Sequence, residues 1–395
     1  MRIRYFAYFY PPCVGGGEVI LQHQAEELAR RGHEVHVHTT TYTNLNLAEE
    51  TEAGSREERG VHVHRHRSAR IPVRNPLEVS AITPGLLADV ARPADLLVCL
   101  GYPSLHLDWL LPRARAAGTP LVVQNYVTAE FLAEILSGAG GVGKRVRAGY
   151  WSAWTRPQLR RASMVLADSP RAGAALRARL GLDNVRVHIG MAVDPAEFEV
   201  PMDARRDVRA RLGLGGDRIL LAPSRLARQK GADILVQAAA PLLGSGWRLV
   251  IPGAVNEPEF AQEVRRLAAP LGERVVFGPV PRGELLALFR EADVVVLPSR
   301  GETVGGVVFE GMWCGALCIV SDAVEAAADD YLRPGENGLS FRSEDVGSLR
   351  VALARAMSEP LTSLREAGRT MVAERFIWER SVDRLLRLYE EAMGA

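Results

Sequence analysis

Short apolar runs alternate with longer helical segments along nearly the whole chain, and this alternation restricts the fold more than any other feature. Residues 96–100 and 294–297 are continuous apolar stretches, which is typical of parallel strands covered by helices on both faces. The pattern therefore predicts an α/β protein built on parallel sheets. The expected strands are residues 3–9, 34–40, 61–67, 96–100, 120–124 and 164–167, and then 218–222, 248–251, 275–277, 294–297 and 317–320.

Two such series fit in one chain of 395 residues, which is too long for a single ordinary core. A charged, glycine-bearing connector separates them, so we place the boundary near residue 200. This predicts two doubly wound, Rossmann-like domains, over 1–200 and 201–376, with an amphipathic helix over 377–395 that packs back on the first. Two such domains that face each other leave a cleft at the carboxyl ends of their strands, where doubly wound folds bind ligands.

The charge balance excludes some partners. Lys and Arg total 48 and Asp and Glu total 47, so the net charge of +1 argues against a nucleic-acid binder. No apolar run approaches the roughly 20 residues of a membrane-spanning helix, and Pro11 and Pro12 end the short apolar run at the N-terminus. The four cysteines are scattered without a C-x-x-C pair, so we expect a soluble cytoplasmic protein.

The loop Ser224-Arg-Leu-Ala-Arg-Gln-Lys-Gly231 follows one expected strand and leads into a helix near Ala232. Backbone N–H groups at a helix start favour anions, and Arg225 and Lys230 add two positive charges. A diphosphate needs this combination of a forked and a point-like cation. The alternative is two solvated cations on a surface loop.

A second loop, Pro298-Ser-Arg-Gly-Glu-Thr-Val-Gly-Gly-Val-Val-Phe-Glu310, also joins a strand to a helix. Gly305 and Gly306 leave the backbone bare, so that a ligand can approach the amides. Glu302 lies in the loop and Glu310 about two turns along the helix, so the two carboxylates can contact different parts of one extended ligand. The alternative is a solvated helix face.

Together these residues resemble the retaining family-4 glycosyltransferases of the GT-B fold. The R-x-x-x-x-K pair of that family is matched by Arg225 and Lys230, and its E-x7-E signature by Glu302 and Glu310. The resemblance extends from about residue 1 to 390. Further matches are the glycine turn Gly15-Gly16-Gly17 after the first strand, the segment 32–35, Gly253, and Gly335 to Gly338.

The resemblance implies a metal-independent hexosyltransferase-like enzyme that uses a UDP or GDP sugar. Arg225 and Lys230 would bind the donor diphosphate, Glu302 would hold the transferred sugar, and Glu310 would bind the ribose. It implies no cofactor besides the nucleotide sugar. The remaining donor-binding residues would be Gly16, Gly17, Gly253, Thr303, Val304, Gly305 and Gly306.

The acceptor side departs from the family pattern. Many members carry Thr-x-His where this chain has residues 122–127, so Asn125 or Tyr126 stands in the place of the histidine. Gly311 and Leu317 replace the family's Ala and Pro. We therefore expect an unusual acceptor chemistry beside an intact donor site.

Two further features have open interpretations. The histidines alternate along two strands, which suits a metal, but without a carboxylate or cysteine fixed nearby we favour exposed strand faces. The segment 144–161 has six cations, no acid and three aromatic residues. It is either a helix packed on its own domain or a weak contact with an anionic membrane surface. The histidines concerned are His33, His36, His38, His62, His64 and His66.

We therefore expect a retaining glycosyltransferase that moves a sugar to a natural product or to a glycan or lipid intermediate. The alternatives are another GT-B enzyme, such as a sugar-phosphate synthase or a nucleotide-sugar epimerase, and a non-catalytic partner subunit. An intact set of Arg225, Lys230, Glu302 and Glu310 argues against the last.

Overall fold

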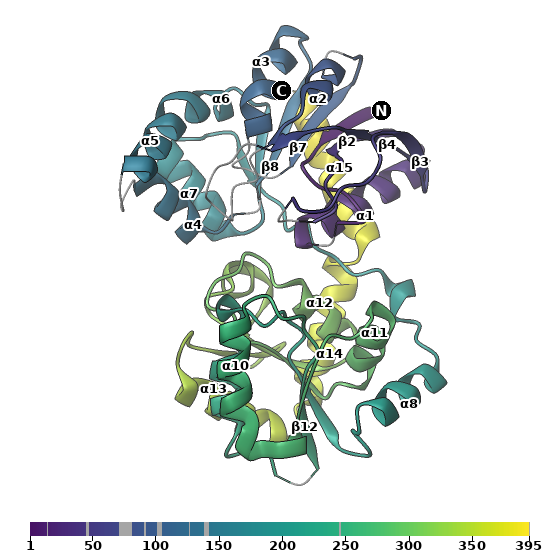
Figure 1. The fold of residues 1–395 in the computed structure, drawn as a ribbon, viewed down its shortest axis with the longest axis vertical. Helices are drawn as coiled ribbons and strands as arrows, with labels where there is room; N and C mark the ends of the chain where they lie inside the picture. The colour runs from purple at the N-terminus through teal and green to yellow at the C-terminus, as the bar shows by residue number, and fades with distance from the viewer. Residues whose placement is uncertain are drawn as a thin grey trace. The chain divides into compact units, whose positions relative to one another are not determined.

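The computed structural model describes residues 1–13, 15–44, 47–70, 81–90, 92–100, 105–125, 127–137, 142–244 and 246–394. The chain forms two compact units. Unit 1 comprises Met1–Met191 and Trp378–Ala395, and unit 2 comprises Ala192–Ile377. Each unit is an α/β structure built on its own mainly parallel sheet, so the predicted pair of doubly wound domains is confirmed (Figure 1).

The sheet of unit 1 has the strand order β10-β9-β8-β7-β1-β2-β4-β3, in which only the pair β3–β4 is antiparallel. Its strands are β1 Arg2–Phe6, β2 Glu34–Thr40, β3 Gly54–Glu58, β4 Val61–His66, β7 Leu96–Leu100, β8 Leu121–Asn125, β9 Met164–Ala167 and β10 Val185–Val187. A separate ribbon joins β5 Ala69–Arg70 and β6 Ala81–Ile82. Its helices are α1 Gly16–Arg30, α2 Pro84–Asp89, α3 Leu105–Ala116, α4 Ala129–Ser137, α5 Val142–Tyr150, α6 Arg156–Leu159, α7 Pro170–Leu180 and α15 Trp378–Gly394, with a π-helical turn at Trp151–Thr155.

The last helix belongs to the core of unit 1. The hydroxyl of Tyr389 lies 3.0 Å from that of Tyr5 on the central strand and accepts a hydrogen bond of 3.0 Å from the side chain of Gln124. Val382 and Leu385 are fully buried in the same apolar cluster. Together with α1, which lies in the same apolar cluster, the helix thus covers one face of the sheet.

Unit 2 has the strand order β13-β12-β11-β14-β15-β16, and every pair is parallel. Its strands are β11 Arg218–Leu221, β12 Trp247–Ile251, β13 Val275–Phe277, β14 Val294–Leu297, β15 Leu317–Ser321 and β16 Leu339–Phe341. Its helices are α8 Met202–Arg211, α9 Ala232–Ala239, α10 Pro258–Ala268, α11 Arg282–Glu291, α12 Gly306–Trp313, α13 Val346–Ser358 and α14 Thr362–Arg375, with short turns at Pro195–Phe198, Arg228–Lys230, Ala269–Arg274 and Ala327–Tyr331. Helices α10 and α13 lie on one side of this sheet and α8 and α11 on the other (Figure 1).

Both sheets show why these residues form parallel strands. All five residues of β7 and all four of β14 are buried, because helices cover both faces. Strand β16, which was not among the expected strands, forms the edge of the sheet beside β15. Among the described helices, none is long and apolar enough to cross a bilayer.

Candidate active site

The loops that carry the predicted donor residues of unit 2 follow strands near the point where the strand order of its sheet reverses. The strands β12 and β13 lie on one side of β11, and β14 to β16 lie on the other, so β11 and β14 flank the point at which strand order reverses. Doubly wound folds bind ligands at this point, beyond the carboxyl ends of the strands. The two loops that carry the predicted motifs follow β11 and β14 themselves.

These two loops contact each other through charged side chains. The ammonium Nζ of Lys230 lies 2.8 Å from Oε1 of Glu302. Both side chains are largely buried, with 15% of Lys230 and 23% of Glu302 exposed. The buried hydroxyl of Ser299 donates a hydrogen bond of 3.0 Å to the other oxygen of Glu302. Both oxygens of this carboxylate are therefore fixed in the structure.

Further hydrogen bonds fix the positions of the two loops relative to each other. The amide of Arg300 donates to the carbonyl of Gln229 at 2.7 Å, and the side chain of Gln229 donates to the carbonyl of Gly301 at 2.7 Å. The guanidinium of Arg300 also pairs with Asp233 in the first turn of α9, at 2.7 Å. The relative placement of Lys230 and Glu302 thus rests on a rigid frame.

Two glycines allow the close approach of these segments. A Cβ on Gly253, which follows β12, would lie 1.8 Å from the carbonyl oxygen of Ser224. A Cβ on Gly231 would lie 2.0 Å from the carbonyl oxygen of Pro298, and this residue has a φ of +69°. Both contacts are with backbone, which cannot rotate away, so larger residues would push the loops apart.

The glycine turn before α12 is equally constrained. Gly305 has a φ of +74° and precedes the helix, and the hydroxyl of Tyr331 donates a hydrogen bond of 2.6 Å to the carbonyl of Val304. Gly306 begins α12, whose first turn has amide N–H groups without an intrahelical acceptor. Thr303 lies in the same loop and is partly exposed. These amides can therefore serve a ligand.

Glu310, the fifth residue of α12, has a different partner. Its Oε1 accepts a hydrogen bond of 2.7 Å from Arg282, at the start of α11, and 18% of its side chain is exposed. Burial raises the pKa of Glu310, and the Arg282 guanidinium opposes this effect. Arg282 was not among the predicted site residues, although a cation at the start of the helix that follows the expected strand 275–277 is a signal that could have been used.

The remaining predicted residues are spread more widely. Arg225 is exposed in the loop after β11. Gly16 and Gly17 are the first two residues of α1 in unit 1. The carboxylate of Glu18 lies over this turn, because its Oε2 is 2.2 Å from the position that a Cβ on Gly15 would take. This carboxylate would repel a phosphate at the start of α1. Asn125 ends β8, but its side chain and the whole of Tyr126 lie outside the described residues.

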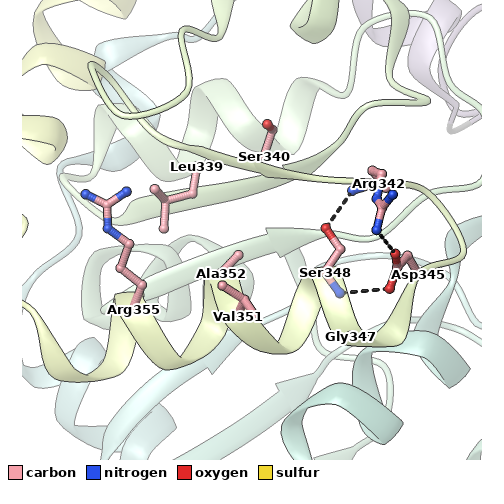
Figure 2. A pocket seen from close by; sticks show the side chains of 9 residues that line it. All are labelled: Leu339, Ser340, Arg342, Asp345, Gly347, Ser348, Val351, Ala352 and Arg355. Carbon is pink, nitrogen blue, oxygen red and sulfur yellow. Dashed lines mark hydrogen bonds and ion pairs between the residues drawn. The ribbon is translucent and has the colours of Figure 1, made fainter.

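A pocket of about 510 Å³ lies elsewhere in unit 2, between the edge strand β16 and α13 (Figure 2). Its two arginines are already paired, Arg342 with Asp345 at 2.6 Å and Arg355 with Glu359 at 2.9 Å. None of the predicted site residues lines it. Volume alone therefore does not identify the site in this protein.

The expectation of exposed histidine faces is wrong for the strands β2 and β4. These strands pair in parallel, so that their histidine rings stack, with His38 and His64 centroids 4.6 Å apart. His38 is fully buried, and a carboxylate is in fact fixed nearby. Oδ2 of Asp89, at the end of α2, lies 3.1 Å from Nδ1 of His38 and 3.3 Å from Nε2 of His66.

Among the described residues, His38, His66 and Asp89 are the one group with metal-ligand spacing. A neighbouring cation argues against a metal there. Arg4 Nη1 lies 3.2 Å from Nε2 of His38, and because a guanidinium only donates, Nε2 must accept. The proton of neutral His38 is then on Nδ1 and donates to Asp89, which occupies the atom that a metal would need. The cluster is a hydrogen-bond network.

In the segment 144–161, some side chains pack on unit 1 and others are exposed. Arg156 donates a hydrogen bond of 2.7 Å to the carbonyl of Leu180, and Arg160 donates one of 2.9 Å to that of Gly181, at the end of α7. These two cations therefore stabilise a helix end. Val146 and Trp154 are 66% and 49% exposed. The remaining face of this segment thus presents large apolar side chains to solvent.

Comparisons with known proteins show the family and the fold of this chain. The family described as Glycosyl transferase 4-like domain matches residues 15–190, and the family described as Glycosyl transferases group 1 matches residues 204–371. D-inositol 3-phosphate glycosyltransferase 1 of Catenulispora acidiphila is 33% identical over 313 residues, which are 74% of this chain and 73% of that protein. The lipopolysaccharide core biosynthesis mannosyltransferase LpcC of Rhizobium leguminosarum is 29% identical over 252 residues, 62% of this chain and 68% of that protein.

A solved structure shows the same fold. HepE from Anabaena, in complex with UDP and glucose, superposes with a TM-score of 0.74 over 98% of each chain, at 19% identity. The match covers both units, each with its doubly wound sheet. With two family matches that lie on the two units and a relative of this coverage, the chain belongs to the family-4 glycosyltransferases of the GT-B fold.

Proposed function

We propose that this glycosyltransferase moves a sugar from a nucleoside diphosphate sugar to an acceptor with retention of configuration. The observation that supports the proposal best is the pair of Lys230 and Glu302 at the point where strand order reverses. A cation for the diphosphate and a carboxylate for sugar hydroxyls lie there 2.8 Å apart. One ligand that contains both groups would engage both side chains.

Catalysis would depend on the charge of the leaving group. As the bond between the anomeric carbon and the phosphate oxygen breaks, negative charge grows on the diphosphate. Lys230 and Arg225 would stabilise that charge, and no metal is needed for it. The ion pair with Glu302 fixes the ammonium of Lys230 in the site. The electrostatic stabilisation thus requires little rearrangement.

The sugar would be oriented by Glu302 and by the turn before α12. The carboxylate of Glu302 is fixed by Lys230 and Ser299, and the amides of residues 303–306 are bare of bulky side chains at Gly305 and Gly306. Fixed groups of this kind hold a reacting sugar in one orientation. Glu310 would accept hydrogen bonds from the ribose hydroxyls.

The acceptor proton needs a base, and the family's histidine is absent from this chain. We infer that the leaving phosphate oxygen takes the proton. The acceptor oxygen then bonds to the anomeric carbon on the face from which the diphosphate departs, which preserves the configuration. Tyr126 is the second candidate for the base.

The acceptor is a small phosphorylated molecule or a glycan or lipid intermediate. The names of the two relatives support both classes, since one acts on D-inositol 3-phosphate and the other in lipopolysaccharide core biosynthesis. For the second class, the exposed Val146 and Trp154 with the basic residues around them would give a weak contact with an anionic membrane surface. Sedimentation with anionic vesicles, but not with neutral ones, would support this contact.

A panel of nucleotide sugars tests the proposed function. UDP, GDP and ADP sugars are screened for an increase in the melting temperature, and the stabilising donor is incubated with candidate acceptors. We expect transfer, with the anomeric configuration of the donor preserved in the product by NMR. Conversion of the donor without an acceptor would favour an epimerase. Failure of every nucleotide sugar to bind would favour a non-catalytic partner subunit.

A further inference from the structure

Glu310 is joined to a second acidic residue through one arginine. Arg282 Nη1 donates to Oε1 of Glu310 at 2.7 Å, and Nη2 of the same guanidinium donates to Oε2 of Glu197 at 2.8 Å. Glu197 lies in the turn Pro195–Phe198 near the start of unit 2. The three residues come from three separate segments of unit 2, so the arrangement is built by the tertiary fold.

The arginine is held in place by its surroundings. Its guanidinium carbon lies 5.9 Å from the ring centroid of Phe198, and Glu197 occupies one side of its fork. Arg282 also begins α11, so its backbone is fixed by a helix. A guanidinium restrained on two sides offers its remaining N–H groups in a defined direction.

Arg282 binds one of the two carboxylate oxygens of Glu310. Arg282 contacts Oε1, and among the described residues the structure gives Oε2 no hydrogen-bonding partner. Glu310 is only 18% exposed, so without a neighbouring cation its carboxylate would be costly to keep charged. Burial raises the pKa of Glu310, whereas Arg282 lowers it. The cation thus favours the form that accepts hydrogen bonds.

We propose that Arg282 is a positioning residue that binds one oxygen of Glu310 and so aims the other at the ribose hydroxyls of the nucleotide. The inference rests on the proposed function. It assigns Arg282 an effect on recognition of the ribose and not on the diphosphate or the sugar. Glu197 would act one step further out, by fixing Arg282.

The test compares ligands that differ in one hydroxyl. Binding of UDP, GDP and ADP to the unaltered full chain is measured by calorimetry, and the best ligand is compared with its 2′-deoxy form. We expect Arg282→Gln to weaken binding of the ribonucleotide about tenfold and of the 2′-deoxy form less than about twofold. Arg282→Lys should recover part of the loss, and Glu310→Gln should abolish the difference between the two ligands.

Arg211→Gln is the matched control, because Arg211 pairs with Glu284 on the same helix α11. It should leave both affinities unchanged, with any loss of stability shown by the melting temperature. Equal losses for both ligands in Arg282→Gln, or no loss, would overturn the inference and leave the proposed function standing. If the unaltered chain binds none of the three nucleoside diphosphates, both proposals fail.

Discussion

Lys230 and Glu302 form an ion pair between the loops that follow β11 and β14, with 2.8 Å between nitrogen and oxygen. Each of the two charges is compensated by the other. Loss of either residue therefore has two effects. It removes the contact that we propose with the ligand, and it leaves an opposite charge unpaired in a site that is mostly buried.

The first prediction concerns this pair. Lys230→Ala should weaken nucleoside diphosphate binding by about 1.5–3 kcal/mol, or roughly 10–150-fold, because a charge-assisted contact is lost and the carboxylate of Glu302 then repels the phosphate. Calorimetry with UDP or GDP measures the change. The control is Arg228→Ala, which removes a cation of the same loop that pairs with Glu263. Unchanged affinity in Lys230→Ala would rule out the proposed diphosphate contact.

The second prediction concerns the approach of the loops after β11 and β12. Gly253→Ala places a Cβ 1.8 Å from the carbonyl oxygen of Ser224, so the backbone must move. We expect a loss of about 1–3 kcal/mol in the free energy of unfolding, together with weaker nucleotide binding. Gly216→Ala is the control, since no atom lies within 4 Å of the new Cβ. Similar unfolding midpoints in urea for the two variants would contradict this prediction.

The third prediction is that transfer needs no divalent metal. In the proposed mechanism, the cations Arg225 and Lys230 would take the place that a metal has in other diphosphate sites. Activity should therefore survive dialysis against EDTA and should not rise when magnesium or manganese is added. Activity that disappears with the chelator and returns with either ion would show that the prediction is wrong.

The fourth prediction concerns the acceptor side. Asn125 cannot take a proton at neutral pH, and a tyrosine, which ordinarily titrates at about pH 10, is a poor base there. Asn125→Ala and Tyr126→Phe should therefore raise the KM for the acceptor while most of kcat remains. A base contributes about 10²–10⁴-fold to rate. A fall in kcat of more than about a thousandfold in Tyr126→Phe, with KM preserved, would instead identify the tyrosine as the base.

The fifth prediction is that acid destabilises unit 1 more than unit 2. All nine histidines precede residue 192, so unit 2 contains none. Burial lowers the pKa of His38 to about 2 and that of His64 to about 4, and it also lowers the pKa of His36 and His66. Unfolded histidines have a pKa of about 6.5 and bind protons first, so stability is full above that pH and falls below it.

Each such histidine contributes a slope of up to about 1.4 kcal/mol per pH unit between its unfolded and folded pKa. Hydrogen exchange measured at a series of pH values distinguishes the two units. Asp89 and Glu34, which lie beside the cluster, reduce the effect without reversing it. His64→Gln should flatten the pH dependence of unit 1. His188, also buried in unit 1, has its pKa lowered to about 3 by burial and adds to the effect. Equal acid sensitivity in both units would contradict the assignment of the effect to the buried histidines of unit 1.

The sequence predicts the fold well where a single segment contains the information. Strands such as β14 are apolar throughout because both faces of the sheet are covered by helices. The four residues of β14 are enough to show this pattern in the sequence. Strand β3 was missed because Gly54–Glu58 is polar and mostly exposed, and it is a strand only through its pairing with β4. Pairing of this kind is a property of the tertiary structure.

The residues of the candidate site also differ in how far the sequence predicts their contacts. The proximity of Lys230 and Glu302 could be expected from the sequence, because each follows a strand in a loop with glycines and parallel strands bring such loops to one edge. The contact of Arg282 with Glu197 and Glu310 joins residues that are 85 and 28 positions apart, and no local pattern indicates it. The carboxylate of Asp89 beside His38 is a contact of the same type.

The position of α15 has a consequence for the order in which the chain folds. Unit 2 is continuous from Ala192 to Ile377, whereas unit 1 needs Val382, Leu385 and Tyr389 to complete its core. During synthesis, the ribosome must therefore translate all of unit 2 before the first unit can close. A nascent chain that stalls before Trp378 lacks α15, so the apolar surface that this helix covers beside α1 stays exposed although the sequence of unit 2 is complete. Unit 1 is thus the first unit to be synthesised and the last to complete its core. Chaperones that bind exposed apolar surface would have access to it until α15 is synthesised.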